Sequence, residues 1–324
     1  MASFRQMPST GPVSVPKPLR QRAEEVFLRA IRAYTFNTPV KKGTYRLFTR
    51  AMKACRYPHD AMLVPTIDGR SLSVDLTSGM ENTVFFHGRY EPVLSEIVMG
   101  LIGPGDVCID IGANFGWYTT LFAKLVGESG SVHAFEPVPR MFEELKTNRD
   151  LLPKNEHVFL NNTALGDKIQ AVTINLFIGE ATGHASISTM GRNDVESFDC
   201  EMITLDSYLQ SNSIDNVDFI KLDVEGSELM VLNGASEAFA QRTPPTLLVE
   251  MALESTRHFG YLPNDLLVFL KGKADYLFYS VDEVRGRLRP IDSFDPTDIG
   301  ANVFCLPRSA AESKHEVINR FLET

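Results

Sequence analysis

The sequence predicts an α/β fold built on a largely parallel sheet, and three observations support this prediction. From residue 107 onward, short apolar segments with strand character alternate with segments of helical periodicity. Such alternation is typical of βαβ units, whose strands run parallel. A glycine-spaced turn follows the first of these strands, and an acidic residue follows the second. Both lie at carboxyl ends of strands, where ligands bind in open α/β sheets.

The first sixty residues are strongly basic. Residues 1–59 contain twelve Lys or Arg against two Glu, a balance of +10, which leaves −19 for the remainder of a chain whose net charge is −9. Residues 1–18 are rich in Pro and Ser and are expected to be disordered. Residues 19–34 have helical spacing with arginines between the apolar side chains, and 44–55 predict a second short helix. Such a basic amphipathic helix can lie on a membrane surface. We expect instead that both helices pack on the body and leave their arginines in water.

The remaining elements follow in order along the chain. Residues 62–76 alternate about Asp68-Gly69, which predicts a β-hairpin. A helix is expected from Pro92, since proline suits the first helical turn and a Gly-Pro-Gly segment ends the pattern near residue 101. Strands are expected at 107–111, 131–135, 157–160, 172–178, 218–222, 246–250, 277–281 and 302–306. Helices are expected from 116, over 139–148, 227–240 and 263–270, and from a capping-box pattern at 309–312.

Composition limits the class of protein. The 324 residues are 44% hydrophobic and 23% charged, which is ordinary for a globular chain. No apolar run approaches the roughly 20 residues of a membrane span, and no signal peptide precedes the N-terminal prolines. The four cysteines lie far apart without a C-x-x-C pair, which argues against a disulfide framework or a zinc site. We therefore expect a soluble, cytoplasmic protein.

The glycine turn matches neither of the two common phosphate-binding patterns. It reads Asp110-Ile-Gly112-Ala-Asn114-Phe-Gly116. A dinucleotide fingerprint starting at Gly112 requires glycine at 114 and 117, and a P-loop requires a following Gly-Lys-Ser/Thr. Asp110 can hold backbone donors or a ligand ammonium group, while the glycines let a ligand approach the main chain closely.

The acid at the end of the second strand narrows the class of ligand. Glu136 follows Gly112 by twenty-four residues, and a carboxylate at such a strand end can accept both hydroxyls of a ribose. A ribose without a pyrophosphate turn indicates a nucleoside ligand such as S-adenosylmethionine. The glycine spacing argues against a nicotinamide-dependent dehydrogenase.

Four segments then occur in order between residues 85 and 250. They read "GDVCIDIGANFGWYTTLFAKLVGESGSVHAFEPVPRMFEELKTN", "NTALGD", "TLDSYL" and "FIKLDVEGSELMVLNGA". Together they resemble the FkbM family of S-adenosylmethionine-dependent methyltransferases. The resemblance implies the class I methyltransferase fold, a Rossmann-like, seven-stranded and mostly parallel sheet with an antiparallel last strand. It also implies methyl transfer to hydroxyl groups of sugars, polyketides and related metabolites.

The resemblance divides the chain into four parts. We expect a disordered N-terminus at 1–18, a basic helical extension with the hairpin at 19–84, the methyltransferase domain at 85–308 and a C-terminal helix at 309–324.

The resemblance also implies which residues hold the cofactor. The glycine turn would line its methionine side, Glu136 would hold the ribose, and Ala164 and Leu165 would lie at the adenine. The segment "FFHGRYEP" resembles the family's first segment, so Tyr90 and Glu91 would close over the cofactor. The expected cofactor-binding residues are Tyr90, Glu91, Asp110, Gly112, Ala113, Asn114, Gly116, Thr119, Glu136, Ala164, Leu165 and Asp223. Trp117 is assigned no role.

Methyl transfer to a hydroxyl also needs an acceptor for the hydroxyl proton. Asp223 and Glu250 end the fourth and fifth core strands, Glu225 falls in "KLDVEGSE", and His184 falls in a loop that resembles the family's segment over the substrate cleft. These four are the expected catalytic residues. The other candidates, Glu228 and His258, are expected to be structural or exposed.

A metal is a further question for this cluster. The acids could together bind Mg²⁺, which takes oxygen ligands. Carboxylate clusters also serve without a metal, so no metal ligand is assigned.

Two other functions compete with this one. A nucleic-acid methyltransferase would suit the basic N-terminus, but the chain lacks an Asn/Asp-Pro-Pro-Tyr/Phe segment and a Pro-Cys nucleophile, and its acidic body would repel phosphate. A non-catalytic S-adenosylmethionine-binding scaffold is disfavoured by the presence of Asp110, Glu136 and Asp223. The expected partner is a small-molecule or glycan hydroxyl acceptor. Peripheral membrane contact through the basic helix and a homodimer stay open.

Overall fold

The structure is a computed structural model that describes residues 18–38, 43–55, 61–178, 184–295 and 300–322. Its contacts divide the chain into two units, Met1–Asp60 and Ala61–Thr324, which are described separately. The expected disorder of residues 1–18 falls almost entirely outside the described residues. Among the helices that the structure describes, none combines the length and apolarity needed to cross a bilayer.

The smaller unit contains the two predicted helices, α1 (Leu19–Asn37) and α2 (Thr44–Ala54), which contact one another. On α1, Leu28 and Thr35 are completely buried and Arg32 is 8% exposed. Leu19 and Val26, by contrast, are 85% and 67% exposed. Arg20, Arg22 and Arg29 are exposed, as expected, whereas Arg32 lies on the covered face with Leu28. That the two helices pack on the body stays a prediction.

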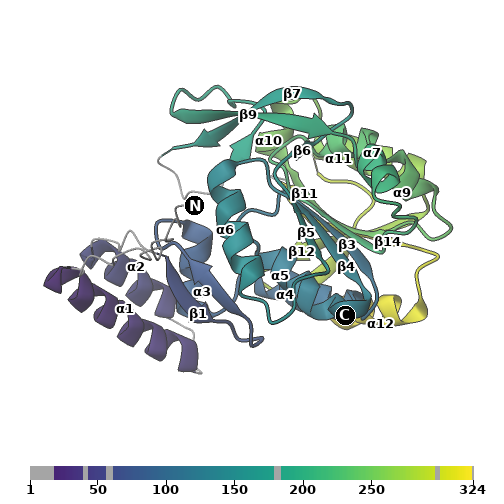
Figure 1. The fold of residues 1–324 in the computed structure, drawn as a ribbon. Coiled ribbons are helices and arrows are strands. Elements are labelled where there is room, and N and C mark those ends of the chain that lie inside the picture. The colour runs from purple at the N-terminus through teal and green to yellow at the C-terminus, as the bar shows by residue number, and fades with distance from the viewer. Residues whose placement is uncertain (1–17, 39–42, 56–60, 179–183, 296–299, 323–324) are drawn as a thin grey trace, which may run out of the picture. The chain divides into compact units, whose positions relative to one another are not determined.

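The larger unit is built on a twisted eight-stranded sheet (Figure 1). Its strands are β3 (Val107–Ile111), β4 (Ser131–Phe135), β5 (Val158–Asn161), β10 (Phe219–Leu222), β11 (Thr246–Ala252), β12 (Tyr276–Asp282), β13 (Arg287–Pro290) and β14 (Gly300–Pro307). They are ordered β13-β12-β14-β11-β10-β3-β4-β5, and β14 runs antiparallel to both of its neighbours. The strand order and the antiparallel last strand are those of a class I methyltransferase, as expected. Strand β13 adds an eighth strand at the edge, because the chain after β12 turns back in a hairpin.

Helices cover both faces of this sheet (Figure 1). One face is covered by α5 (Trp117–Val126) with α4 (Pro92–Leu101) and α6 (Pro139–Asp150). On the other face a single apolar cluster joins the sheet to α7 (Leu205–Ser211), α8 (Glu228–Asn233), α9 (Ser236–Ala240) and α11 (Pro263–Lys273). The remaining helices of this unit are α3 (Gly79–His87), α10 (Leu253–Arg257) and α12 (Glu312–Phe321).

Two helix boundaries differ from those expected. The helix expected over 227–240 is divided into α8 and α9, because a Cβ at Gly234 would lie 2.0 Å from the Gly166 carbonyl oxygen and Asp206 accepts hydrogen bonds from the backbone N–H groups of Ser236 and Glu237. The C-terminal helix begins at Glu312 after a turn, so the expected capping box at 309–312 does not form.

A second, four-stranded sheet lies next to the main one. It consists of β6 (Ala164–Leu165), β7 (Gln170–Phe177), β8 (Ala185–Ser186) and β9 (Val195–Ile203), in the order β6-β9-β7-β8. Only β7 is predicted from the sequence. Its partner β9 was missed, although Phe198, Cys200 and Met202 alternate with acidic residues, which is the pattern of a strand with one covered face.

The predicted hairpin forms from β1 (Met62–Pro65) and β2 (Ser71–Val74). Arg70 at its turn is 6% exposed and donates to the Trp117 carbonyl oxygen at 2.7 Å and the Thr120 hydroxyl at 2.6 Å, both on α5. The hairpin therefore belongs to the larger unit, whose contacts begin at residue 61. This boundary differs from the expected one at 84/85.

Candidate active site

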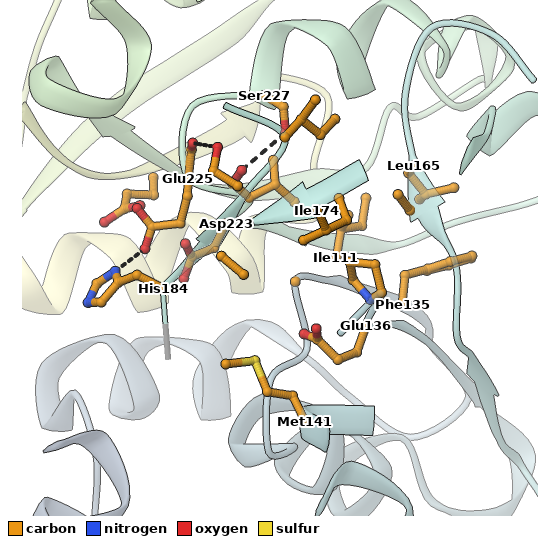
Figure 2. A pocket seen from close by; sticks show the side chains of 18 of the residues that line it. Ile111, Phe135, Glu136, Met141, Leu165, Ile174, His184, Asp223, Glu225 and Ser227 are labelled. Atoms are coloured by element: carbon orange, nitrogen blue, oxygen red, sulfur yellow. Dashed lines mark hydrogen bonds and ion pairs between the residues drawn. The ribbon is translucent and has the colours of Figure 1, made fainter. Parts of the chain in front are cut away.

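The carboxyl ends of four parallel strands meet at one edge of the main sheet. The register aligns Ile111 with Phe135 and Leu222, and Leu222 with Val249. The residues just beyond these positions are Gly112, Glu136, Asp223 and Glu250. Parallel pairing in this register therefore brings the glycine turn and three of the predicted acids to the same edge. Figure 2 shows two of these acids, Glu136 and Asp223.

A pocket with a cavity volume of about 120 Å³ lies at this edge and opens to solvent. The predicted site residues that line it are Tyr90, Glu91, Gly112, Glu136, Ala164, Leu165, His184, Asp223, Glu225 and Glu250. The second sheet contributes Ala164, Leu165 and Ile174 to one side. The expected cofactor and catalytic residues are thus largely brought together by the fold.

Five predicted cofactor residues do not line the pocket: Asp110, Ala113, Asn114, Gly116 and Thr119. Asp110 is completely buried, and its Oδ2 accepts a hydrogen bond from the Thr119 hydroxyl at 2.6 Å. Its Oδ1 has no hydrogen-bond partner among the described residues, although the Lys221 ammonium lies 3.9 Å away. Ala113, Asn114 and Gly116 are part of the turn itself, and contact of these five residues with a cofactor stays a prediction.

The glycine turn depends on a close approach of two strand ends. Gly112 has φ of 78°, and a Cβ there would lie 1.8 Å from the Asp223 carbonyl oxygen. Gly116 has φ of 92°, and a Cβ there would lie 2.7 Å from Leu145 Cδ1. Only glycine satisfies both the left-handed backbone and the missing space.

Glu136 ties this turn to the next helix. Its Oε2 accepts a hydrogen bond from the Asn114 backbone N–H at 2.8 Å, and its Oε1 accepts one from Val138 at 2.9 Å. The side chain is 4% exposed. Burial raises the pKa of Glu136 to about 7, although the two backbone hydrogen bonds oppose the rise.

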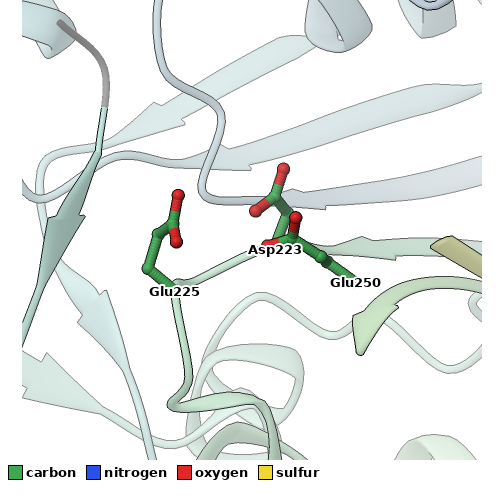
Figure 3. Close-up of side chains that lie close together, drawn as sticks. All are labelled: Asp223, Glu225 and Glu250. Atoms are coloured by element: carbon green, nitrogen blue, oxygen red, sulfur yellow. The ribbon is translucent and has the colours of Figure 1, made fainter. Parts of the chain in front are cut away.

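The opposite side of the pocket holds a cluster of three acids, Asp223, Glu225 and Glu250 (Figure 3). One carboxylate oxygen from each lies within 4.8 Å of the others. The Lys221 ammonium lies 3.2 Å from Asp223 Oδ2, and its charge lowers the pKa of Asp223 against the effect of burial. The Asp223 charge, followed by burial, raises the pKa of Glu250 well above its usual value.

These opposite shifts favour an ionised Asp223 beside a protonated Glu250. Glu250 Oε2 is buried and has no hydrogen-bond partner among the described residues. Asp223 stays ionised because the buried Lys221 compensates its charge.

His184 faces the third acid of the cluster (Figure 2). Its Nδ1 contacts Glu225 Oε1, and the Glu225 carbonyl oxygen accepts a hydrogen bond from the Ser186 hydroxyl at 2.8 Å. Glu225 has φ of 51°, a strained value for a residue with a side chain. A carboxylate at Nδ1 fixes the tautomer in which Nε2 is the basic nitrogen.

The remaining predicted pair, Tyr90 and Glu91, precedes α4. Glu91 has φ of 42°, and its Oε2 accepts a hydrogen bond from the Tyr118 hydroxyl at 2.7 Å. Burial raises the pKa of Glu91 to about 7. The Ser95 hydroxyl donates to the Tyr90 carbonyl oxygen at 2.9 Å and accepts from the Trp117 indole N–H at 3.0 Å. Trp117, which the sequence left without a role, thus supports Tyr90.

Lys221 is the most important residue that sequence reasoning missed. It is 6% exposed and donates to the Gly112 carbonyl oxygen at 3.3 Å as well as to Asp223. Asp223, Asp110 and Glu91 raise its pKa, although burial alone would lower it. The signal was present, since Lys221 is a charged residue inside the otherwise apolar strand "FIKL".

The two acceptor candidates judged structural have different surroundings. Glu228 Oε1 accepts hydrogen bonds from the backbone N–H groups of Gly226 and Val224, as expected for an acid at the start of a helix. His258 lies in a second hollow that shares His184, Glu225 and Glu250 with the pocket. This hollow also contains Arg192 and Arg257.

Comparison with known proteins is in line with this geometry. A model of the methyltransferase FkbM domain matches residues 110–278, more than half of the chain. A hexuronic acid methyltransferase from Haloferax volcanii is 28% identical over 165 residues, which cover 51% of this chain and 61% of the relative. The 31-O-demethyl-FK506 methyltransferase of Streptomyces tacrolimicus is 28% identical over 162 residues, which cover 42% of this chain and 61% of that protein. The match therefore spans about three fifths of the length of each relative.

Among solved structures, an S-adenosylmethionine-dependent O-methyltransferase from Thermotoga maritima aligns over 79% of this chain and 96% of its own, at 15% identity and a TM-score of 0.35. The fold assignment accordingly rests on the strand order and not on this similarity. The family match, together with that strand order, places this chain in the FkbM methyltransferase family.

Proposed function

We propose that the protein is an S-adenosylmethionine-dependent O-methyltransferase that acts on a hydroxyl group of a sugar or a secondary metabolite. One observation carries the proposal: a single pocket joins Glu136 and the glycine turn to the three acids and His184. Methyl transfer from a sulfonium is an in-line displacement, so cofactor and acceptor must lie side by side. The names of the two relatives, one acting on a hexuronic acid and one at the 31-O position of FK506, support this acceptor class.

The cofactor would lie along the turn side of the pocket. Each Glu136 oxygen accepts one backbone N–H, and a carboxylate oxygen has a second lone pair for a ribose hydroxyl. Leu165 and Ile174 offer an apolar surface to the adenine. Tyr90 and Glu91 border the opposite end, where the methionine part would extend toward Asp223.

The acceptor would enter through the second hollow. This hollow meets the pocket at His184, Glu225 and Glu250, so a hydroxyl placed there would approach the methyl group from the acid side. Arg192 and Arg257 line its outer part and could contact oxygen-rich or anionic groups of an acceptor.

His184 is the base that this arrangement supports best. The hydroxyl oxygen would attack the methyl carbon, and the carbon–sulfur bond would break with its electron pair left on sulfur. The hydroxyl proton would pass to His184 Nε2, whose Nδ1–H is held by Glu225. Asp223, kept ionised by Lys221, would accept a hydrogen bond from the acceptor hydroxyl and orient it.

A divalent cation is the alternative to this proton transfer. The oxygens of Asp223, Glu225 and Glu250 lie close enough to one another to share one, and hard cations such as Mg²⁺ take oxygen ligands. Such a cation would supply Lewis-acid lowering of the hydroxyl pKa. The Lys221 ammonium, 3.2 Å from Asp223 Oδ2, already compensates the charge of one of these three acids.

The function is tested by measuring release of S-adenosylhomocysteine with a panel of uronic acids, neutral sugars and hydroxylated metabolites. We expect turnover with at least one class, and His184→Gln should lower kcat by about 10²–10⁴-fold. His315→Gln, on α12 and outside the pocket, should leave kcat unchanged.

Three outcomes would change this assignment. Cofactor binding without turnover on any acceptor would favour a non-catalytic scaffold. Methylation of a nucleic acid, but of no compound in the panel, would mean that the acceptor is a nucleic acid and not a sugar or secondary metabolite. Activity that is lost in EDTA and restored by Mg²⁺ would mean that a cation, and not His184, activates the acceptor hydroxyl.

A further inference from the structure

Helix α1 of the smaller unit exposes a stripe of apolar side chains. Leu19, Val26, Phe27 and Tyr34 are 85%, 67%, 43% and 57% exposed. Their spacing, with the exposed alanines at 23 and 30, places them on one face of the helix. An apolar stripe of five or more helical residues facing outward is unusual for a soluble surface and indicates an unfilled interaction site.

In the described part of the unit, packing leaves this stripe exposed. Helix α1 contacts α2, and its buried side chains are Leu28, Thr35 and Arg32. The Arg32 guanidinium lies 4.9 Å from the centre of the Phe36 ring, and burial lowers the pKa of Arg32 to about 10. The helix therefore turns Leu28 inward with Arg32 and Thr35. It leaves Leu19, Val26, Phe27 and Tyr34 exposed to a partner outside the unit.

Arginines of the same helix flank the stripe. Arg20, Arg22 and Arg29 are exposed on α1, and the smaller unit has further exposed cations at Arg46, Arg50 and Lys53 on α2. The acids in the described part of the unit are Glu24 and Glu25, both half-buried, and Glu24 pairs with Arg20 at 3.1 Å. The surface around the stripe is therefore positively charged, whereas residues 60–324 carry most of the negative charge of the chain.

We infer that α1 docks the protein on an anionic lipid surface. A helix with an apolar stripe and flanking arginines lies in the plane of a bilayer, with its apolar side chains at the boundary between headgroups and acyl chains. The flanking cations would contact acidic headgroups, and each adds to the attraction. The acidic remainder of the chain would be repelled from the same surface, so the attachment would be confined to this unit. This inference is independent of the reaction that the pocket performs.

The test uses the full chain and vesicle flotation. We expect binding to vesicles with roughly one third phosphatidylglycerol in phosphatidylcholine, and little binding to phosphatidylcholine alone, because the cations require acidic headgroups. Val26→Ser with Phe27→Ser should weaken this binding by about tenfold or more, because the apolar contact is lost. Arg22→Gln with Arg29→Gln should also weaken it, and salt should weaken the wild type.

Val268→Ser is the matched control. Val268 is 69% exposed on α11 of the larger unit, so this variant replaces an equally exposed valine away from α1. It should bind vesicles as the wild type does. All variants change exposed side chains, and circular dichroism with a melting curve checks that each is folded.

Three results would overturn the inference. The first is wild-type vesicle binding that the Val26/Phe27 variant retains. The second is no binding to anionic vesicles together with self-association that this variant abolishes, which would make the stripe an interface between copies of the chain. The third is no vesicle binding together with salt-sensitive binding to nucleic acid.

Discussion

The two sides of the pocket are held in place by different forces. The turn side consists of Gly112 and Glu136, which are fixed by backbone hydrogen bonds and by the lack of space for a Cβ beside Asp223. The acid side consists of Asp223, Glu225 and Glu250, which are fixed by the charges of Lys221 and the contact with His184.

This difference separates two kinds of change. Substitutions of the glycines on the turn side should act through sterics, and their effects should be nearly independent of pH. Substitutions around the acids should act through charge, and their effects should change with pH.

Gly112→Ala should have the largest effect. The new Cβ would lie 1.8 Å from a backbone oxygen at a φ of 78°, so we expect the free energy of unfolding to fall by about 4 kcal/mol or more. Gly272→Ala is the control, since no atom lies within 4 Å of its Cβ position in α11. It should raise stability by about 0.5–1 kcal/mol. Equal urea midpoints for the two variants would contradict the close strand approach.

Lys221→Met should have the next largest effect. It leaves the completely buried Asp110 and the ionised Asp223 without their cation, which should cost about 3 kcal/mol at neutral pH. Lys221 lowers the folded pKa of Asp223, so the stabilisation it provides is present above the unfolded pKa and is lost as the pH falls.

The deficit of Lys221→Met should therefore shrink as the pH approaches the usual aspartate range near about 4. Denaturation at several pH values measures it. Lys146→Met, which removes a half-exposed ion pair with Glu143, should change stability by less than about 1 kcal/mol at any pH. A deficit of Lys221→Met that is constant with pH would mean that packing, and not charge, explains its role.

Glu91→Gln should have a smaller and opposite pH dependence. Burial raises the pKa of Glu91 from 4.5 to about 7, so its protonated form stabilises the fold below 4.5 and that contribution is lost as the pH rises through 7. Between pH 4.5 and about 7, the free energy of unfolding should fall by about 1–2 kcal/mol less in Glu91→Gln than in the wild type, because glutamine carries no charge. Glu96 is exposed on α4, the helix that Glu91 precedes, so Glu96→Gln should leave the pH dependence of stability unchanged. Identical pH curves for the two variants would contradict this explanation.

Trp117→Phe should have the smallest effect. It keeps an aromatic ring but loses the indole hydrogen bond to Ser95, which in turn holds Tyr90. We expect a loss of about 1 kcal/mol in cofactor binding, or roughly a fivefold higher KM for S-adenosylmethionine with kcat little changed. Ser95→Ala should give a similar change, and the double variant should be no worse than either single one if they act through this one link.

The main sheet could be predicted because its strands are short, apolar and separated by helical patterns. The turn side of the pocket was also predictable, since Gly112, Gly116 and Glu136 are close in sequence to the strand ends they follow. The hairpin was predicted as an element, but its place in the larger unit was not. That place depends on Arg70, whose partners on α5 are about fifty residues away.

The acid side was predicted as a set of residues and not as an arrangement. Asp223 and Glu250 could be placed at neighbouring strand ends, but the ion pair with Lys221 and the contact between Glu225 and His184 depend on side-chain positions that no periodicity encodes. The break between α8 and α9 was missed for the same reason, because it follows from the approach of Gly234 to Gly166 in the folded chain.

The most direct test of the central claim is a calorimetric titration of the purified protein with S-adenosylmethionine, S-adenosylhomocysteine and NAD. We expect both sulfur nucleosides to bind at about micromolar concentration and NAD not to bind. Glu136→Ala should weaken this binding by about a hundredfold. Glu143→Ala should not weaken it, because Glu143 is exposed on α6, the helix that follows Glu136. Silence toward both nucleosides, a preference for NAD, or unchanged affinity in Glu136→Ala would contradict the assignment of this pocket as the cofactor site.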